Sequence, residues 1–219
     1  MKNTIKDSPI VILTGFSTSG KSTLVRKLHS RLGDTFIDID TDNKICDKAG
    51  VKHIYDIYVN HGPDEAIKYI EYTESAVLND IVNINNKPVV VAAGPFVVLR
   101  EGWLELIEKR NPYIIYLEVR PEVVYDGLMN RKLEQMRDAN AKKSQYFRSW
   151  DNNFTVQLTT QGYTDLPRNE SIENITQHLE SIDSLYRRFR HTIYNVDQLR
   201  ADPNTEDHFF SHVIKKLDL

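Results

Sequence analysis

The sequence has almost no cysteine and no long apolar run, and each shortage excludes a class of protein. Cys46 is the only cysteine among 219 residues, so the chain has no internal disulfide framework and suits a reducing compartment. No apolar stretch approaches the roughly 20 residues that span a bilayer, and the first residues lack the apolar core of a signal peptide. We therefore expect a soluble, cytoplasmic protein with no membrane partner.

A strong charge of one sign is also missing. The formal net charge is -3 with the histidines neutral, so no global basic field indicates a nucleic-acid partner. The 7 histidines are scattered without the spacing of a zinc site. Hydrophobic residues at 40% and charged residues at 27% are ordinary for a globular chain. The length suits one α/β domain with a large insertion, and the sequence leaves the oligomeric state open.

Short apolar runs alternate with helical stripes along the chain. The runs at 9–14, 89–93, 113–119 and, more weakly, 192–196 are continuous, as expected of parallel strands that are covered on both faces. Between them lie helical patterns, such as the one that begins with Pro121 in its first turn. Strands that alternate with helices predict right-handed crossovers and a three-layer α/β/α fold around a central parallel sheet.

Residues 131–180 interrupt this alternation. The stretch opens with basic residues and continues through a polar segment, before a helical stripe resumes near Ile172. It contains few apolar residues with which to build a core of its own, and a strand is expected after it. We therefore predict a single domain over residues 1–219 that carries an insertion at about 131–180.

Residues 15–22 read Gly-x-x-x-x-Gly-Lys-Ser, between an apolar run and an amphipathic helical stripe. This is the P-loop pattern in the context that it requires. Gly15 and Gly20 let the backbone curl so that successive amides face phosphate oxygens, and the positive end of the new helix faces the same anion. The residues expected to contact the nucleotide are Gly15, Ser17, Thr18, Ser19, Gly20, Lys21, Ser22 and Thr23.

Two side chains of the loop have distinct expected roles. Lys21 reaches the β- and γ-phosphates, and the Ser22 hydroxyl ligates Mg²⁺. ATP and Mg²⁺ are therefore the expected cofactors, although these residues do not decide between ATP and GTP.

An acidic pattern follows the loop. Residues 36–40 predict a short strand that ends in two carboxylates, and alternation puts Asp38 and Asp40 on the same side of it. In a parallel sheet the carboxyl end of such a strand faces the crevice that holds the P-loop. The two acids are candidates to hold hydrated Mg²⁺ and to accept a proton from a substrate hydroxyl. Asp42 is expected to cap the next helix.

Other classes of P-loop protein fit less well. GTPases read guanine with an Asn-Lys-x-Asp segment, but the two Asn-Lys pairs of this chain are followed at the fourth position by Cys46 and Val89. No apolar run ends in the Asp-Glu pair of motor and transporter ATPases, and the run at 89–93 ends in Gly94-Pro95. A small-molecule kinase, with its metal carboxylates on the second strand, fits better.

The chain resembles the shikimate kinase family from residue 10 to about 78 and again from 88 to 131. The segments that carry the likeness are Gly15-Phe16, Gly20-Lys21-Ser22-Thr23, Phe36-Ile37-Asp38-Ile39-Asp40 and Ala93-Gly94, the last where the family has a glycine triplet. The resemblance implies ATP-dependent phosphorylation of a ring hydroxyl. It implies that Asp38 lies near the metal that Ser22 ligates, and that Asp40 lies near the acceptor hydroxyl, with Gly94 in the same acceptor site.

The chain departs from the family where the family binds its acceptor. Shikimate kinases grip a carboxylate with arginines, and the segment that carries one of them reads Ile70-Glu71-Tyr72-Thr73-Glu74 here. Only Gly94 of the glycine triplet is present, and the arginine expected before Leu185-Tyr186 is absent. A negative Glu71 would repel a carboxylate. We therefore predict a shikimate kinase-like fold whose acceptor is different or undetermined.

The insertion enlarges the short lid of that family, and Arg131 lies where the lid opens. A cation that closes over the γ-phosphate would stabilise charge in the transition state. The leading hypothesis is an ATP:alcohol phosphotransferase with Lys21, Asp40 and Arg131 as catalytic groups. Two alternatives stay open. One is a nucleotide-binding regulatory module without activity, and the other is a nucleoside or nucleotide kinase whose basic lid handles a phosphorylated acceptor.

Overall fold

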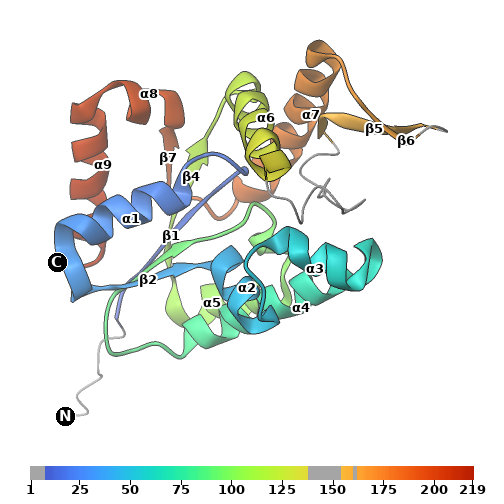
Figure 1. Ribbon diagram of the computed structural model, residues 1–219. Helices are drawn as coiled ribbons and strands as arrows, with labels where there is room; N and C mark the ends of the chain where they lie inside the picture. The colour runs from blue at the N-terminus through green and yellow to red at the C-terminus, as the bar shows by residue number, and fades with distance from the viewer. Residues whose placement is uncertain (1–7, 138–153, 160–161) are drawn as a thin grey trace, which may run out of the picture.

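The computed structural model describes residues 8–137, 154–159 and 162–219. Its centre is a parallel sheet of five strands in the order β2-β3-β1-β4-β7 (Figure 1). The strands are β1 (Ile10–Gly15), β2 (Ile37–Asp40), β3 (Val89–Ala92), β4 (Tyr113–Glu118) and β7 (Thr192–Asn195). Each strand coincides with a segment predicted from the sequence, so the predicted α/β class and its parallel sheet are confirmed.

The middle strands of the sheet are buried on both faces. Every residue of β1 and of β3 is buried, and β4 is buried except at its two ends. Strands that are covered on both faces have no solvent side, which is why these segments are continuously apolar instead of alternating. The edge strand β2 is different, because only Ile39 of its four residues is buried.

Helices cover the two faces of the sheet (Figure 1). One side carries α1 (Lys21–Leu32), α8 (Val196–Ala201) and α9 (Pro203–Lys216), and the other carries α4 (Pro63–Val82) and α5 (Glu101–Arg110). Helices α6 (Pro121–Arg137) and α7 (Arg168–Tyr186) pack on each other. Pro121 opens α6, as predicted, because a proline fits the first turn of a helix. The arrangement is the predicted three-layer fold.

A smaller apolar cluster lies beyond the edge strand β2. Helices α2 (Thr41–Ala49) and α3 (Ile54–His61) pack on α4 there. They enclose a cluster that is separate from the main core, made of Ile45, Ile57, Tyr58 and Ala66. This cluster fixes α4, which carries Glu71 and Glu74, relative to the end of β2.

The stretch between α6 and α7 contains a two-stranded antiparallel ribbon. Its strands are β5 (Val156–Thr159) and β6 (Gly162–Asp165). The sequence predicted a polar insertion here but not these strands, because each has only 4 residues and neither forms a continuous apolar run. A single domain with a lid at about 131–180 stays a prediction. Among the described residues, no helix combines the length and the apolar character needed to cross a bilayer.

Candidate functional site

The loop between β1 and α1 has the backbone that the P-loop pattern requires. Gly15 has a φ of 147° and Gly20 a φ of 89°, values that residues with a side chain rarely adopt. A Cβ at Gly15 would also lie 2.6 Å from the carbonyl oxygen of Leu117, so β4 leaves no room for one. Thr18 is left-handed as well, with a φ of 71°, which costs a non-glycine residue roughly 1–2 kcal/mol. Such a loop persists only when its surroundings hold it in place.

Hydrogen-bond donors converge on this loop. Helix α1 begins at Lys21, and its N-cap, Gly20, has no side chain that could accept a bond from the first-turn amides. Those amides and the positive end of the helix therefore suit an anion. The Lys21 ammonium lies 2.8 Å from the carbonyl oxygen of Gly15 and 2.9 Å from that of Phe16. Of the other predicted contacts, Ser19 is buried and Thr23 is exposed on the first turn of α1.

The Asp40 carboxylate joins β2 to the phosphate loop. One oxygen accepts a hydrogen bond of 2.5 Å from the Ser22 hydroxyl, and the other accepts one of 3.2 Å from the amide of Asn43. Asp40 is therefore the N-cap of α2, and the prediction that Asp42 caps this helix is wrong. The helix begins directly after the strand, at Thr41, so the last strand residue occupies the capping position and Asp42 lies in the first turn.

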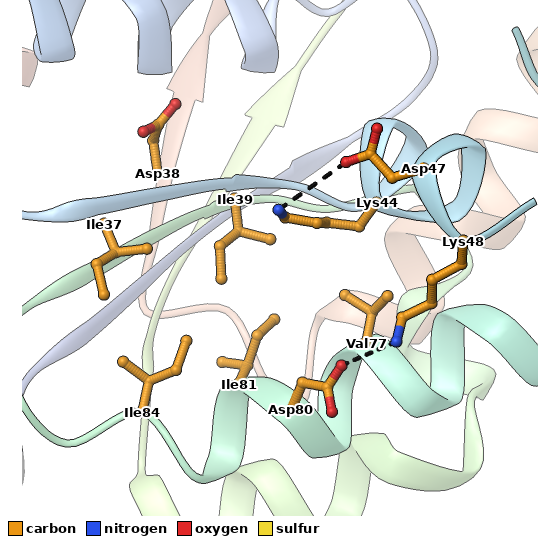
Figure 2. Close-up of a pocket in the computed structure, with 10 residues that line it drawn as sticks. All are labelled: Ile37, Asp38, Ile39, Lys44, Asp47, Lys48, Val77, Asp80, Ile81 and Ile84. Carbon is orange, nitrogen blue, oxygen red and sulfur yellow. Dashed lines mark ion pairs between the residues drawn. The ribbon is translucent and has the colours of Figure 1, made fainter. Parts of the chain in front are cut away.

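Asp38 faces α1, as Asp40 does, but it contacts a residue farther along that helix. Its carboxylate lies 3.3 Å from Nδ1 of His29, which follows Ser22 by about two helical turns, or roughly 10 Å along α1. Figure 2 shows the Asp38 side chain on the opposite side of β2 from those of its two isoleucine neighbours. The two acids share a face, as alternation predicts. The structure brings Ser22 together with Asp40 and not with Asp38.

A cavity of about 490 Å³ lies between β2, α2 and α4 (Figure 2). Ile39 contributes to its apolar lining, and ion pairs from Lys44 to Asp47 and from Lys48 to Asp80 lie beside it. No residue of the phosphate loop lines this cavity. It is therefore distinct from the site that the loop forms.

Helix α6 also reaches the phosphate loop. Nη1 of Arg131 donates a 2.9 Å hydrogen bond to the Ser17 hydroxyl, so the predicted lid cation does contact the predicted nucleotide site. One turn earlier, Gly127 lies against Thr18, where a Cβ at position 127 would be 2.7 Å from the Thr18 Cβ. The missing side chain at Gly127 allows α6 to approach the loop this closely.

One basic contact to the loop was not predicted. Nη2 of Arg200, in α8, donates a 2.9 Å hydrogen bond to the carbonyl oxygen of Thr18. Arg200 therefore holds the left-handed residue of the loop from a second helix. No local pattern marks Arg200, because it lies 182 positions after Thr18 and becomes its neighbour only through the return of the chain after β7.

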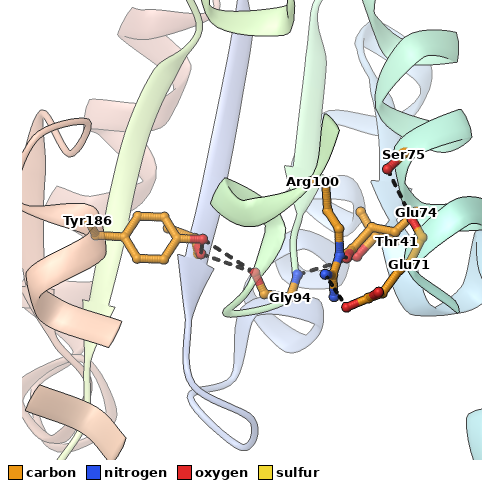
Figure 3. A network of polar contacts seen from close by, with 8 residues as sticks. Thr41, Glu71, Glu74, Ser75, Gly94, Arg100 and Tyr186 are labelled. Atoms are coloured by element: carbon orange, nitrogen blue, oxygen red, sulfur yellow. Dashed lines mark hydrogen bonds and ion pairs between the residues drawn. The ribbon is translucent and has the colours of Figure 1, made fainter. Parts of the chain in front are cut away.

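A polar network lies past the carboxyl ends of β1 and β3 (Figure 3). The Gly94 amide donates to Oγ1 of Thr41 at 3.3 Å, and the Gly94 carbonyl accepts from the Tyr186 hydroxyl at 3.4 Å. Thr14 donates a 2.6 Å bond to the Tyr186 oxygen. Burial raises the pKa of Tyr186, so its hydroxyl keeps the proton that it donates. These bonds hold Gly94 beside the junction of β2 and α2, where Asp40 lies.

The same network includes three charged side chains (Figure 3). Arg100, which precedes α5, forms ion pairs of 3.0 Å with Glu71 and 2.5 Å with Glu74, both on α4. Glu74 is buried, and its Oε1 lies 3.3 Å from the position that a Cβ of Gly94 would occupy. Burial raises the pKa of the Glu74 carboxyl, and the Arg100 guanidinium opposes that shift. The sequence singled out Glu71 but missed Arg100 as its partner, because no local spacing joins the two.

The oxygen donors at the loop suit a hydrated divalent cation that arrives with a nucleotide. In the part of the chain that the structure describes, no group of three or more His, Cys, Asp or Glu side chains could hold a metal ion. The Ser22 hydroxyl and the Asp40 carboxylate, 2.5 Å apart, are both oxygen donors. Mg²⁺ keeps several waters and uses one or two carboxylates together with substrate phosphates. The donor set therefore fits Mg²⁺.

A phosphate loop after the central strand β1, with an acidic partner at the end of the edge strand β2, defines the class. The chain is a P-loop kinase of the small-molecule type, as predicted. Within that class it belongs to the shikimate kinase family, whose family model matches residues 17–216. The resemblance predicted from the sequence is therefore confirmed.

Individual relatives agree with this assignment. The shikimate kinase of Bacillus cytotoxicus is 29% identical over 178 residues, which cover 77% of this chain and 94% of that protein. The shikimate kinase of Caldanaerobacter subterraneus subsp. tengcongensis is 31% identical over 122 residues, which cover 56% of this chain and 66%, just under two thirds, of that relative. The crystal structure of shikimate kinase from Bacteroides thetaiotaomicron matches with a TM-score of 0.61 at 18% identity, and the match covers 96% of this chain and 99% of that one. This structural match shows that the fold is shared.

Proposed function

We propose that this chain transfers the γ-phosphoryl group of ATP to a hydroxyl group of a small molecule. The observation that carries the proposal is the 2.5 Å contact between Asp40 and Ser22, because it puts a carboxylate beside the phosphate loop. A hydroxyl bound next to Asp40 would meet a proton acceptor and the end of the triphosphate together. Membership of the shikimate kinase family supports the same reaction.

The cations at the loop are proposed to bind and polarise the phosphates. Lys21, which contacts loop carbonyls, would turn to the β- and γ-phosphates, while the amides of residues 15–22 cradle them. Arg131 would approach from α6, where it contacts Ser17. Charge spreads over the transferred group in the transition state, so these positive groups lower the barrier by electrostatic stabilisation.

The acidic residues of β2 are proposed to serve the metal and the acceptor. When bound, Mg²⁺ neutralises charge on the β- and γ-phosphates, and Ser22 is its proposed ligand on the loop. Asp40 bonds to Ser22, so we assign it to orienting that hydroxyl and accepting the proton of the acceptor. Asp38 is proposed as a further metal contact, a role that would require its carboxylate to leave His29. Gly94 is proposed to line the acceptor site.

Lys21→Ala tests the proposal. MgATP binding is measured by calorimetry, and phosphoryl transfer to shikimate, polyols, sugars, nucleosides and their phosphates is followed by phosphorus NMR. We expect the wild type to phosphorylate at least one acceptor, and the variant to lose turnover by on the order of 10²- to 10³-fold. Lys27→Ala is the matched control, because Lys27 lies on the same helix and pairs with Glu206 at the surface.

The outcomes separate the alternatives. Nucleotide binding without transfer to any acceptor would contradict phosphotransfer and support a regulatory module. A phosphorylated acceptor that outcompetes its neutral analogue would support a nucleotide kinase. Failure to bind any magnesium nucleotide would contradict all of these functions.

A further inference from the structure

The acceptor side of the site holds a connected set of three charges, the Glu71–Arg100–Glu74 set (Figure 3). The guanidinium donates to Glu74 through Nε and to Glu71 through Nη1. The side chain of Arg100 is 14% exposed and that of Glu74 5%, whereas that of Glu71 is 51% exposed. The positive member is therefore enclosed by acids, and Glu71 is the member that a ligand can reach.

This set lies next to the proposed transfer site. Oε1 of Glu74 lies 3.3 Å from the position that a Cβ of Gly94 would occupy, and the Gly94 amide donates to Thr41, which directly follows Asp40. Strands β2 and β3 run parallel with Asp40 opposite Ala92, so Gly94 lies just past the carboxyl end of β3, beside the carboxyl end of β2. A ligand whose hydroxyl reaches Asp40 therefore has the Glu71–Arg100–Glu74 set as its neighbour.

The charges of the set are unfavourable for a carboxylate ligand. Two carboxylates face one guanidinium, so the set carries an excess of negative charge. Arginine binds a carboxylate through its paired N–H donors, and two of the Arg100 donors already bond to Glu71 and Glu74. A carboxylate ligand would have to displace one acid and then lie against it. Like charges brought together in a partly desolvated site are strongly disfavoured.

We propose that the acceptor of this chain is a neutral polyol, a hydroxyl compound that carries no carboxylate. This inference rests on the proposed function, because it names the acceptor class of the same site. A carboxylate such as Glu71 can only accept hydrogen bonds, and the hydroxyl groups of a polyol supply the donors. Arg100 orients Glu71 for this role by holding its Oε1 at 3.0 Å. The chain then keeps the family fold but differs from relatives that are named for shikimate, which is a carboxylate.

Shikimate and its methyl ester form a matched pair of probes, because they share their ring hydroxyls and differ in one negative charge. Binding of each is measured by calorimetry with a non-hydrolysable MgATP analogue present, and phosphoryl transfer to each is measured with MgATP. We expect the wild type to bind or phosphorylate the ester about tenfold better than the acid, as one unrelieved contact between like charges implies.

Variants at Glu71 test whether this residue sets the preference. Glu71→Arg should improve binding of the acid, or phosphoryl transfer to it, about tenfold, because the substitution replaces a repulsive charge with an attractive one. The same quantities for the ester should stay nearly unchanged. Glu71→Gln, which only removes the charge, should act in the same direction by less. Glu65→Gln is the matched control, since Glu65 lies on the same helix and pairs with Lys68. It should leave the ratio of acid to ester unchanged.

Two results would overturn the inference. One is a wild-type preference for the acid. The other is a failure of Glu71→Arg to improve binding of the acid or phosphoryl transfer to it, whether or not the wild type binds either probe measurably. Failure of the proposed function is recognised separately, since it appears as absent binding of magnesium nucleotide or as binding without phosphoryl transfer to any acceptor, whereas this inference is decided by the ratio of acid to ester.

Discussion

The phosphate loop and the Glu71–Arg100–Glu74 set both lie at the carboxyl ends of the strands, but they offer different groups to an incoming anion. At the loop, Lys21 donates to carbonyl oxygens, and Arg131 donates to a hydroxyl. On the acceptor side, Arg100 is paired with two carboxylates of the protein itself. The loop also offers the uncapped first-turn amides of α1, which suit an incoming anion, whereas a guanidinium already paired with two carboxylates gains little from one.

This difference separates what the two regions recognise. Every ATP-dependent reaction presents the same phosphates, so the loop keeps the full P-loop pattern of glycines, lysine and serine. The acceptor changes from one kinase to another, and there the chain has Glu71 at the position where the resemblance to the family implies an arginine. Five predictions test that contrast, beginning with the largest expected effect.

Asp40→Asn should lower kcat by on the order of 10²- to 10³-fold, because the amide cannot accept the proton of the acceptor. The dissociation constant for MgATP should change little, since the phosphates bind mainly to the loop. Asp38→Asn should lower kcat by less than about tenfold, because Asp38 contacts His29 and would reach the metal only by leaving that contact. Steady-state kinetics and calorimetry on both variants check this. Equal losses in the two variants would show that Asp38 also serves the metal.

Arg100→Gln should destabilise the fold by about 3 kcal/mol, because it leaves the buried Glu74 without its counter-charge. Differential scanning calorimetry should show a Tm lower by roughly 6–12 °C, with MgATP affinity unchanged. Lys68→Gln, which breaks an exposed pair, should have no measurable effect on Tm.

The loss of stability in Arg100→Gln should also depend on pH. Burial already raises the pKa of Glu74, and removal of Arg100 takes away the main opposing effect. A carboxyl whose folded pKa is raised destabilises the fold as the pH rises through that pKa. The deficit should therefore be largest at pH 8 and shrink toward pH 5. A deficit that does not change with pH would contradict the role given to Glu74.

Arg131→Ala should lower kcat/KM for MgATP by about 10- to 100-fold, because it removes one cation from the transferred phosphoryl group. Arg131→Lys should recover part of the loss, since it restores the charge without the planar donors. Arg168→Ala is the control, because Arg168 lies in the neighbouring α7 and faces Asp126. Equal kinetics for Arg131→Ala and the wild type would exclude Arg131 from the site.

Gly127→Ala should have the smallest effect and should separate nucleotide affinity from stability. The new Cβ would press on Thr18 at 2.7 Å, so the loop must shift. We expect MgATP affinity to fall about fivefold, the equivalent of about 1 kcal/mol. The Tm should stay level or rise, because alanine favours a helix over glycine by up to about 1 kcal/mol. Calorimetry and thermal unfolding measure the two quantities, and unchanged affinity would show that α6 does not hold the loop.

The strands and the phosphate loop could be predicted because their signals are local. β1 and β3 are buried on both faces, and such strands are continuously apolar in any sequence. Gly15 and Gly20 adopt backbone angles that few other residues tolerate, so the pattern of glycines reports the geometry directly. Residues that are close together in the sequence are enough to specify these features.

The residues whose roles were predicted wrongly or missed depend on the packing of the fold and not on local signals. Asp42 was predicted as the cap of α2, but the helix begins two residues earlier, at Thr41, and Asp40 is the cap. The difference matters, because the same Asp40 carboxylate that caps α2 also accepts the hydrogen bond from Ser22. Arg100 and Arg200 were missed, since their partners lie on segments that the fold alone brings together.

The sequence by itself determined the parallel sheet, the phosphate loop and the face of β2 that carries both acids, because backbone preference and alternation act over a few residues. Tertiary structure decided which acid meets Ser22, which helices hold Thr18, and how Arg100 is shared between Glu71 and Glu74. Charges are satisfied through space and not along the chain, so the way an arginine is paired follows from packing and cannot be predicted from local sequence.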